Sequence, residues 1–251
     1  LVAPRVLAAT LCVPILVMAA DIIGVMGGYL VAVNSLGFNG VTYLHNTFEF
    51  MQPQDVILGL VKAAVFGFII AAILGLILAV TRIAFPSTAW FILVAVELIR
   101  STPLLIQIFF IYFVFPSFGI VLDAFTAGVL ALGLHYGAYC SEVYRAGFDN
   151  IPRGQWEAST ALNLNGWTTF RDIIIPQAIP PIIPALGNYL VALFKETPLL
   201  SAIAVLELMQ TAKIIGSDTF RYTEPITLVG LFFLVMSLVS AGLIRMAEAA
   251  L

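Results

Sequence analysis

Long apolar segments without charge recur through this chain, and they restrict its fold more than any other feature of the sequence. A helix that crosses the hydrocarbon core of a bilayer needs about 20 mostly apolar residues, and every backbone polar group must be bonded within it. Windows of this kind without Asp, Glu, Lys or Arg span 63–81, 101–122, 124–141, 173–194 and 225–244, and a further window, 6–36, is interrupted only by Asp21. The sequence therefore predicts an all-α membrane protein with about six transmembrane helices.

The composition excludes several other classes of protein. Hydrophobic residues make up 61% of the chain and charged residues 10%, which is far from the composition of a soluble domain. The apolar segments are too many and too evenly spaced for a signal peptide followed by a globular domain. Cys12 and Cys140 both lie in apolar runs and are expected to be buried thiols rather than a disulfide or metal ligands. The sequence shows no HExxH motif, paired catalytic acids or Ser/His/Asp order, so we expect neither an enzyme nor a bound metal.

Proline and the charged residues suggest where the helices begin and end. We expect helices at 5–37, 56–81, 88–115, 124–144, from about 176 to 194, and 224–245, with a shorter re-entrant or interfacial helix at 199–213. Pro103 falls inside the third helix, and Pro176, Pro180, Pro181 and Pro184 crowd the start of the fifth. Proline in a helix interior removes a hydrogen bond and kinks the helix, and broken helices at membrane depth are tolerated where they line a cavity. The fifth helix is therefore expected to be broken and to border a solute path.

One polar segment, 142–176, interrupts this apolar chain and carries three of its eleven basic residues. Pro152 and Gly154 should end the preceding helix, and a short helix is expected at 154–163. The Asn165-Gly166 pair should end it, and Thr169 with Asp172 should form a capping box for the next helix. Trp156, Leu162 and Leu164 are presented among polar groups. The segment is either an ordinary amphipathic connector or a knob for the groove of a soluble partner.

The register of this segment resembles the cytoplasmic EAA loop of ABC importer permeases. Glu157, Ala158, Ile173 and Pro176 match that pattern, while Ser159, Asn163 and Ile175 depart from it conservatively or at the turn glycine. The resemblance implies a coupling helix that contacts an ATPase. The residues that it implies for this contact are Arg153, Gly154, Gln155, Glu157, Ala158, Ser159 and Asn163.

The resemblance extends over residues 74–248, which look like a polar amino-acid type ABC importer permease of the His/Gln permease kind. Its ordered motifs are ELIRSTPLLIQ at 97–107, LGN at 186–188, FKETPLLSAI at 194–203 and LIRMAE at 243–248. Within that family, QWEASTALNL, FKETPLLSAIAVLELMQ and RYTEP are most similar to ectoine and hydroxyectoine importer permeases. The resemblance implies a type I ABC importer permease core with a cytoplasmic coupling helix.

The first 70 residues resemble a different family, the C-terminal part of Mla-type lipid-transport ABC permeases. We therefore expect a fusion joined near 68–74, with lipid-permease-like helices at 1–73 and an importer permease domain at 74–251 whose coupling loop is 145–175. The lipid permease's own ATPase contact is not expected in such a fragment. A Mla-type phospholipid-transport permease and a non-functional fusion remain alternatives, and the sequence leaves open whether the fusion is natural, engineered or an assembly artefact.

The importer resemblance also implies partners and a location. The sequence has no phosphate-binding loop, so ATP would be hydrolysed by separate cytoplasmic ABC ATPase subunits, with no cofactor bound by this chain. A second permease subunit, identical or homologous, and a periplasmic or lipid-anchored solute-binding protein are expected, and nucleic acid is not. The resemblance implies a bacterial cytoplasmic (inner) membrane protein, and the positions of Lys and Arg favour an orientation with the coupling loop and both termini in the cytoplasm.

Polar residues within the predicted spans are the candidates for the solute path, because ionisable groups are costly to place in lipid and usually have a function there. The polar candidates are Glu97, Arg100, Thr102, Gln107, Asn188, Lys195 and Glu196, and the apolar Ile182 and Ala185 are expected to line the same path. Glu97 with Arg100, and Lys195 with Glu196, could instead be self-neutralised structural pairs. Asn188 is placed to bond a zwitterion, and the apolar Ile182 and Ala185 one and two turns earlier favour a neutral or zwitterionic solute over a strongly cationic one. His135 is expected to be a helix-packing residue and His45 an exposed loop residue.

Overall fold

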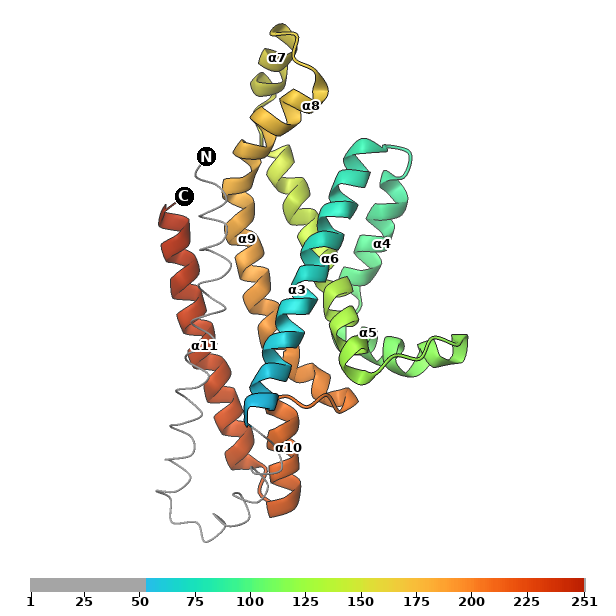
Figure 1. Cartoon of the computed structure of the whole chain (residues 1–251), viewed down its shortest axis with the longest axis vertical. Coiled ribbons are helices and arrows are strands. Elements are labelled where there is room, and N and C mark those ends of the chain that lie inside the picture. Colours follow the sequence, from blue (N-terminus) through green and yellow to red (C-terminus); the bar gives the residue numbers. More distant parts are fainter. Residues whose placement is uncertain (1–52, 251) are drawn as a thin grey trace.

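A computed structural model describes residues 53–250, and this part of the chain is helical without a strand. The first predicted helix, with Cys12 and Asp21, and the loop residue His45 lie outside the described residues. The elements are α3 (Pro53–Ala84), α4 (Ala89–Ser101), α5 (Leu104–Phe109), η1 (Phe110–Val114), η2 (Phe115–Phe118), α6 (Ala124–Asp149), α7 (Arg153–Ala161), α8 (Gly166–Thr168), η3 (Thr169–Ile174), α9 (Ile175–Glu196), η4 (Thr197–Ile203), α10 (Leu208–Thr219) and α11 (Thr223–Ala250). The long helices run roughly alongside one another, as Figure 1 shows.

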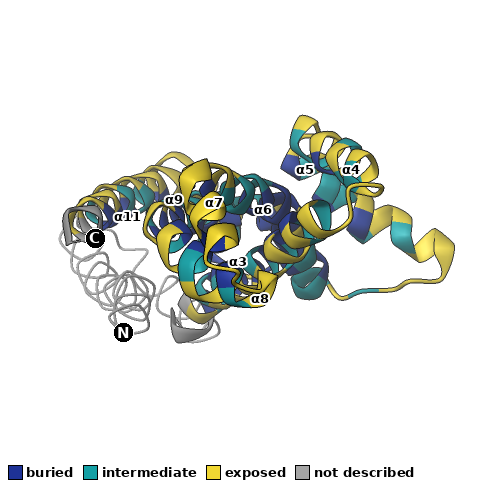
Figure 2. Ribbon diagram, turned by 90° about the horizontal axis from the view of Figure 1, so that it is seen from above, coloured by how far each residue is buried: buried dark blue, intermediate teal, exposed yellow. Residues whose placement is uncertain are grey.

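Three helical segments of the described chain are long and apolar enough to cross a membrane: 58–84, 166–203 and 223–246. Helix α4 and the segment 104–118, which contains α5, η1 and η2, form a fourth span if they are counted together. The two parts are bent by 102° relative to each other. The predicted span at 124–141 corresponds to α6, which does not reach the same apolarity. The reason is its position: α6 packs against α3, α4, α5 and α9, and much of its surface is buried, as Figure 2 shows. A helix covered by other helices can carry histidine and tyrosine side chains without exposing them to lipid.

Glycine residues bring α3 and α6 into close contact along most of their length. A Cβ at Gly67 would lie 3.2 Å from the Cβ of Leu132, and one at Gly75 would lie 2.6 Å from the Cβ of Cys140. From the other side, a Cβ at Gly133 would lie 2.5 Å from a side-chain atom of Ile70. Small residues at such interfaces let helix backbones approach closely, which supplies the van der Waals packing that holds membrane helices together. The α3–α6 pair is therefore the centre of the fold.

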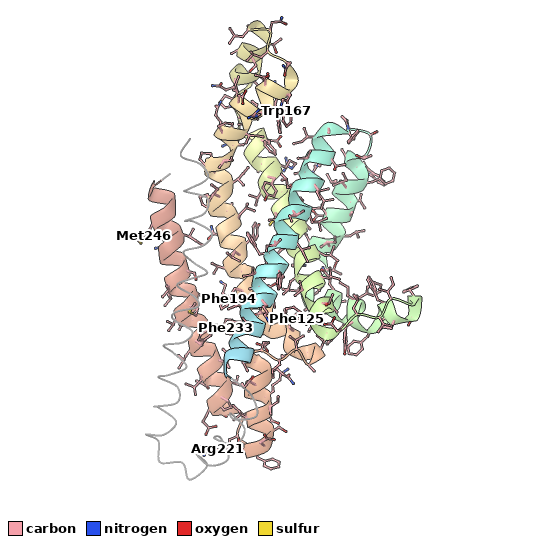
Figure 3. All side chains as sticks on the ribbon, viewed as in Figure 1. Phe125, Trp167, Phe194, Arg221, Phe233 and Met246 are labelled. Carbon is pink, nitrogen blue, oxygen red and sulfur yellow. The ribbon has the colours of Figure 1, made fainter. Side chains whose placement is uncertain are left out.

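On the other side of this centre, α9 joins α3 and α6 to α11. The rings of Phe194 on α9 and Phe233 on α11 lie 5.4 Å apart between their centroids, and Figure 3 labels both. Leu193 and Phe194 are almost fully buried in the same core as Leu132 and Met236. Leu231, Leu234 and Leu238 on α11 are exposed, which suits a helix that faces lipid.

The helix predicted at 88–115 is wrong, because the chain breaks at Pro103. Thr102 is extended, with ψ of 134°, as a residue before proline prefers. Pro103 has no backbone N–H, so the carbonyl of Ile99 loses its helical donor, and it accepts the N–H of Thr102 at 3.3 Å. The side chain of Gln107 supplies donors instead: its Nε2 donates to the carbonyls of Ile99 at 2.7 Å and Thr102 at 3.1 Å. The result is an arm, α5 with η1 and η2, that projects sideways from the bundle in Figure 1.

Replacing Gln107 with leucine is expected to lower the free energy of unfolding by about 1 kcal/mol, because the carbonyls of Ile99 and Thr102 would lose a side-chain donor while Ile99 keeps the N–H of Thr102. Thermal unfolding of the detergent-purified protein measures this loss. The matched control is Asn188→Leu, which removes an exposed amide from α9 and should not lower the unfolding temperature. Equal stability of Gln107→Leu and the wild type would show that the break does not depend on this side chain.

The helix predicted to be broken by prolines is continuous in the structure. Pro180, Pro181 and Pro184 all lie inside α9, which runs on from the π-helical turn η3. Pro180 and Pro181 are exposed, so their rings stand on the unpacked side of the helix. The predicted helix at 199–213 is instead two pieces, the 3-10 turn η4 and α10. The buried Glu207 separates them, because its carboxylate accepts the N–H groups of Met209 at 2.8 Å and Gln210 at 2.7 Å at the start of α10.

Candidate coupling loop and intramembrane polar cluster

The polar segment between α6 and α9 forms the end of the molecule that carries α7. Helix α6 ends at Asp149, and Pro152 precedes the first residue of α7. Proline is favoured at such a position because its missing N–H would have no partner there. Helix α7 covers Arg153–Ala161, close to the predicted 154–163. Figure 1 shows α7 and α8 projecting beyond the ends of α3 and α4.

The residues predicted to contact an ATPase lie on this projection. Arg153, Gly154, Gln155, Glu157 and Ala158 are exposed, and a Cβ at Gly154 would meet nothing within 4 Å. In contrast, Ser159 is buried, and its hydroxyl donates to the carbonyl of Gln155 at 2.7 Å. Ser159 therefore holds the turn together instead of presenting a side chain to a partner.

The turn after α7 differs from the prediction. The residue with a left-handed backbone is Asn163, with φ of 52°, and not the Asn165-Gly166 pair. The side chain of Asn165 accepts the N–H of Thr168 at 2.8 Å, so Asn165 caps the next helix. The predicted capping box of Thr169 and Asp172 is wrong, because Thr169 is buried inside the continuous helical run of α8 and η3. Asparagine serves both turns, because it tolerates left-handed angles and also accepts an N-cap hydrogen bond.

Large apolar side chains are exposed around α7. Their exposed fractions are 40% for Trp156, 72% for Leu162, 36% for Leu164 and 70% for Trp167. Figure 3 labels Trp167, which the sequence analysis did not identify. Its position directly after Asn165-Gly166, at the start of a helix, indicates that it lies on the surface. Exposed apolar groups among polar residues are typical of a surface that binds a protein partner.

A small apolar cluster lies beneath this surface. Ile151, Ile174, Ala178 and Ile182 are buried together, and the rings of Phe148 and Phe170 lie 5.4 Å apart at its edge. The cluster joins the end of α6 to η3 and α9. The amide Nε2 of Gln177 on α9 also donates to the Oε1 of Gln155 on α7 at 3.3 Å. Helix α7 is therefore tied to α9, and Ile182 lies in this cluster.

An ion-pair cluster ties the same end of α6 to α3. The Glu142 carboxylate accepts from Arg82 Nη1 at 2.8 Å and from Arg145 Nη2 at 2.9 Å. Arg145 also pairs with Asp149 at 2.5 Å. Glu142 is thus the bridge between a cation on α3 and a cation on α6.

Replacing Glu142 with glutamine is expected to cost about 1–3 kcal/mol of unfolding free energy, because two partly buried arginines would lose their shared counterion. Glu224→Gln is the matched control: it breaks an exposed pair with Arg221, which precedes α11, and should cost less than about 1 kcal/mol. Thermal unfolding of both variants measures these two losses of stability. A loss for Glu142→Gln no larger than for the control would mean that the bridge is not structural.

A second polar cluster lies within the helix bundle, between α4, α6 and α9. The Arg100 guanidinium carbon lies 5.1 Å from the centroid of the Tyr139 ring. Tyr139 lies 5.6 Å from Tyr189 and 6.1 Å from Tyr136 between ring centroids. The cluster brings a cation on α4 together with aromatic rings of α6 and α9. The three tyrosines are missing from the sequence prediction, although Tyr136 and Tyr139 share one face of a helix by their spacing.

The other residues proposed for the solute path have different surroundings. Glu97 is 65% exposed and its carboxylate lies 3.7 Å from Arg100, so the expected structural pair is present. Lys195 and Asn188 are exposed, and Ala185 is half-buried. Thr102, whose hydroxyl donates to the carbonyl of Leu98, and Gln107 both bond the backbone at the Pro103 break. His135 is buried, with its Nδ1 3.3 Å from Gln107 Oε1, as expected of a helix-packing residue.

Comparison with known families gives two matches. Residues 71–251 match the family described as binding-protein-dependent transport system inner membrane component. Residues 1–76 match the family described as Permease MlaE. These matches agree with the resemblance to two permease families, and they overlap where the fusion is predicted. The division into domains remains a prediction.

Individual relatives agree with the first match. The chain is 44% identical over 197 residues to a probable amino-acid ABC transporter permease protein, y4tG, of Sinorhizobium fredii, covering 77% of this chain and 85% of that one. It is 43% identical over 128 residues to the L-cystine transport system permease protein TcyB of Bacillus subtilis, covering 51% of this chain and 55% of that one.

Solved structures share the fold. A crystal structure of an amino acid ABC transporter with histidines superposes with a TM-score of 0.75 at 34% identity, covering 85% of this chain and 99% of that one. An inward-facing MetNI methionine ABC transporter superposes with a TM-score of 0.57 at 21% identity, covering 76% and 91%, which shows the fold alone. The type I ABC importer permease fold is confirmed, and the chain is a transporter subunit rather than an enzyme. Because the first family match extends over most of the chain, the protein belongs to the family of inner membrane components of binding-protein-dependent transport systems.

Proposed function

We propose that this chain is the permease subunit of an ATP-driven ABC importer for a polar amino acid or a related zwitterionic solute such as ectoine. The observation that carries the proposal is the exposed helix α7, which presents Glu157 at the end of the bundle in the register of an importer coupling loop. The names of the relatives support the substrate class, since they include amino-acid and L-cystine permeases. The ectoine assignment rests on the sequence resemblance alone.

The proposed mechanism uses the apolar cluster beneath α7 and the ion pair that joins α6 to α3. Cytoplasmic ATPase subunits would receive α7 in a cleft, with Glu157 as the central contact and Arg153, Gln155 and Ala158 around it. Closure of the ATPases would move α7, and the cluster around Ile174 would transmit this movement to α9. The Glu142–Arg82 ion pair would transmit it to α3. Because the apolar cluster joins the end of α6 to η3 and α9, and the ion pair joins α6 to α3, the membrane helices would rock as a unit.

The remaining partners follow from the same proposal. A second copy of the permease or a homologue would complete the membrane path, and a solute-binding protein would deliver substrate on the outer face. The coupling loop and both termini would lie in the cytoplasm of a bacterium. The match of residues 1–76 to Permease MlaE favours one alternative, a phospholipid-transport permease. A fusion without activity is the third possible outcome of the test.

Reconstitution in proteoliposomes with candidate ATPase subunits and binding proteins tests the proposal. Uptake of labelled L-glutamine, L-histidine, L-cystine and ectoine is measured with and without internal ATP, beside transfer of a fluorescent phospholipid. The proposal predicts ATP-dependent uptake of at least one solute and no phospholipid transfer. Phospholipid transfer without solute uptake would support the alternative, and the absence of both would indicate an inactive fusion.

A further inference from the structure

A fully buried carboxyl group lies at the joint between η4 and α10, the segment 204–207. Glu207 is 0% exposed, and its two oxygens accept the backbone N–H groups of Met209 at 2.8 Å and Gln210 at 2.7 Å. Among the described residues no ion pair reaches this carboxyl. A buried charge is costly unless a counterion pairs with it. The charged and neutral forms of Glu207 therefore compete within the folded protein.

The charges around the joint do not neutralise Glu207. Lys213 on α10 acts on the carboxyl through its charge alone, because its Nζ donates to Ser201 Oγ on η4 at 2.9 Å. Helix η4 itself has no ionisable side chain. The other ionisable side chains described near this end of α3, α10 and α11 are exposed: Lys62, Asp218, Arg221, Tyr222 and Glu224.

The joint is built as a hinge that contacts a neighbouring helix. Ala204 has a left-handed backbone, with φ of 58°, which is uncommon for a residue other than glycine and persists only where the surroundings enforce it. The carbonyl O of Leu206 would lie 2.6 Å from a Cβ at Gly59, so the joint packs directly on the backbone of α3. Figure 1 shows α10 at the end of the molecule opposite α7. Opening of the joint would therefore move α10 relative to α3 and to the end of α9.

Burial gives the joint a dependence on pH. It raises the pKa of Glu207 from 4.5 to about 7, although the two N–H groups and the charge of Lys213 lower it. Glu207 lies outside the three segments of membrane-crossing length. In an opened joint the carboxyl would be solvated, and its pKa would return toward 4.5. Between these two pKa values the closed joint binds a proton more tightly than the opened joint, so acid favours the closed form and rising pH favours the opened form.

We propose that Glu207 is a proton-dependent latch, whose protonated form keeps α10 docked against η4 and α3 and whose ionised form favours the release of α10. The latch lies within one chain and does not depend on the proposed import function. In the orientation proposed for the importer, α10 would lie toward the outside of the cell. The pH outside the cell would then set the state of this end of the permease.

Hydrogen exchange of the full chain in nanodiscs, corrected for the intrinsic pH dependence of amide exchange, tests the latch. In the wild type the protection of amides 208–212 should fall at least about tenfold between about pH 5 and about pH 8, because each unit of pH between the two pKa values changes the balance of closed and opened forms by about tenfold. In Glu207→Gln, which stays neutral and keeps an acceptor oxygen, protection should be the same at every pH. Asp218→Asn, which removes an exposed acid from α10, should behave like the wild type.

A second pair of variants leaves the carboxyl in place. Lys213→Met removes the charge that lowers the pKa of Glu207, so the fall in protection should move to higher pH. Ser201→Ala removes the same hydrogen bond but keeps the charge, and should not move the fall to higher pH. Protection of 208–212 in the wild type that does not change with pH, or an equal change in Glu207→Gln, would overturn the latch. A fall in Lys213→Met at the wild-type pH or below would also overturn it, whether or not Glu207→Gln folds.

Discussion

Replacing Gly75 with alanine is expected to leave little folded protein in the membrane. Its new Cβ would lie 2.6 Å from the Cβ of Cys140 and 2.9 Å from the backbone N of Ser141. Backbone atoms cannot move aside as a flexible side chain can, so α3 and α6 would have to separate along their contact. Overpacking of this kind costs about 1–3 kcal/mol and more where backbone is involved. The yield of monodisperse protein and its unfolding temperature measure the effect.

Gly230→Ala is the matched control for this substitution. Gly230 lies inside α11, and a Cβ there would meet nothing within 4 Å. Alanine has the higher helix propensity, by about 1 kcal/mol, so this variant should be as stable as the wild type or more stable. Equal losses in the two variants would show that helix propensity, and not the α3–α6 contact, determines the result.

Replacing Glu157 with lysine is expected to abolish the coupling between ATP hydrolysis and uptake. Glu157 is exposed on α7, so the substitution should leave folding unchanged while reversing the charge at the proposed centre of the ATPase contact. Removing a central contact of an interface costs about 2 kcal/mol or more, which corresponds to at least about a 30-fold loss of ATPase binding. Solute uptake per ATP hydrolysed and ATPase co-purification are the two measurements.

Asp172→Lys provides the control for the charge itself. Asp172 is also an exposed acid of the polar segment, but it lies on η3 and not on α7. It should retain coupling and bind the ATPase like the wild type. Unchanged coupling in Glu157→Lys, or an equal loss in both variants, would contradict the role assigned to α7.

The membrane class and the exposed short helix α7 could be predicted from the sequence because both depend on local patterns. Charge-free windows of membrane length indicate helices directly. The Pro152 and Gly154 pair and the surrounding polar residues mark α7 as a separate short helix. These signals are contained within a few turns of the chain, so tertiary contacts did not alter them.

The details that the sequence did not predict depend on neighbours distant in the chain. The break at Pro103 is stabilised by Gln107, and the role of that side chain is visible only once the chain has turned. Asn163 adopts the left-handed backbone and Asn165 caps the next helix. The sequence does not show which asparagine has which role, because asparagine is suited to both positions. The tyrosine cluster requires that α4, α6 and α9 meet, which hydropathy does not specify.

The central claim, that α7 transmits ATPase closure to this permease, is tested most directly by ATP turnover in proteoliposomes. The wild-type complex is compared with a complex in which 153–161 is replaced by an Ala-Gly-Ser sequence of equal length, each with empty and with solute-loaded binding protein. The account predicts that loaded binding protein stimulates ATP turnover by the wild type and has no effect on the variant. Equal stimulation of both complexes would contradict it.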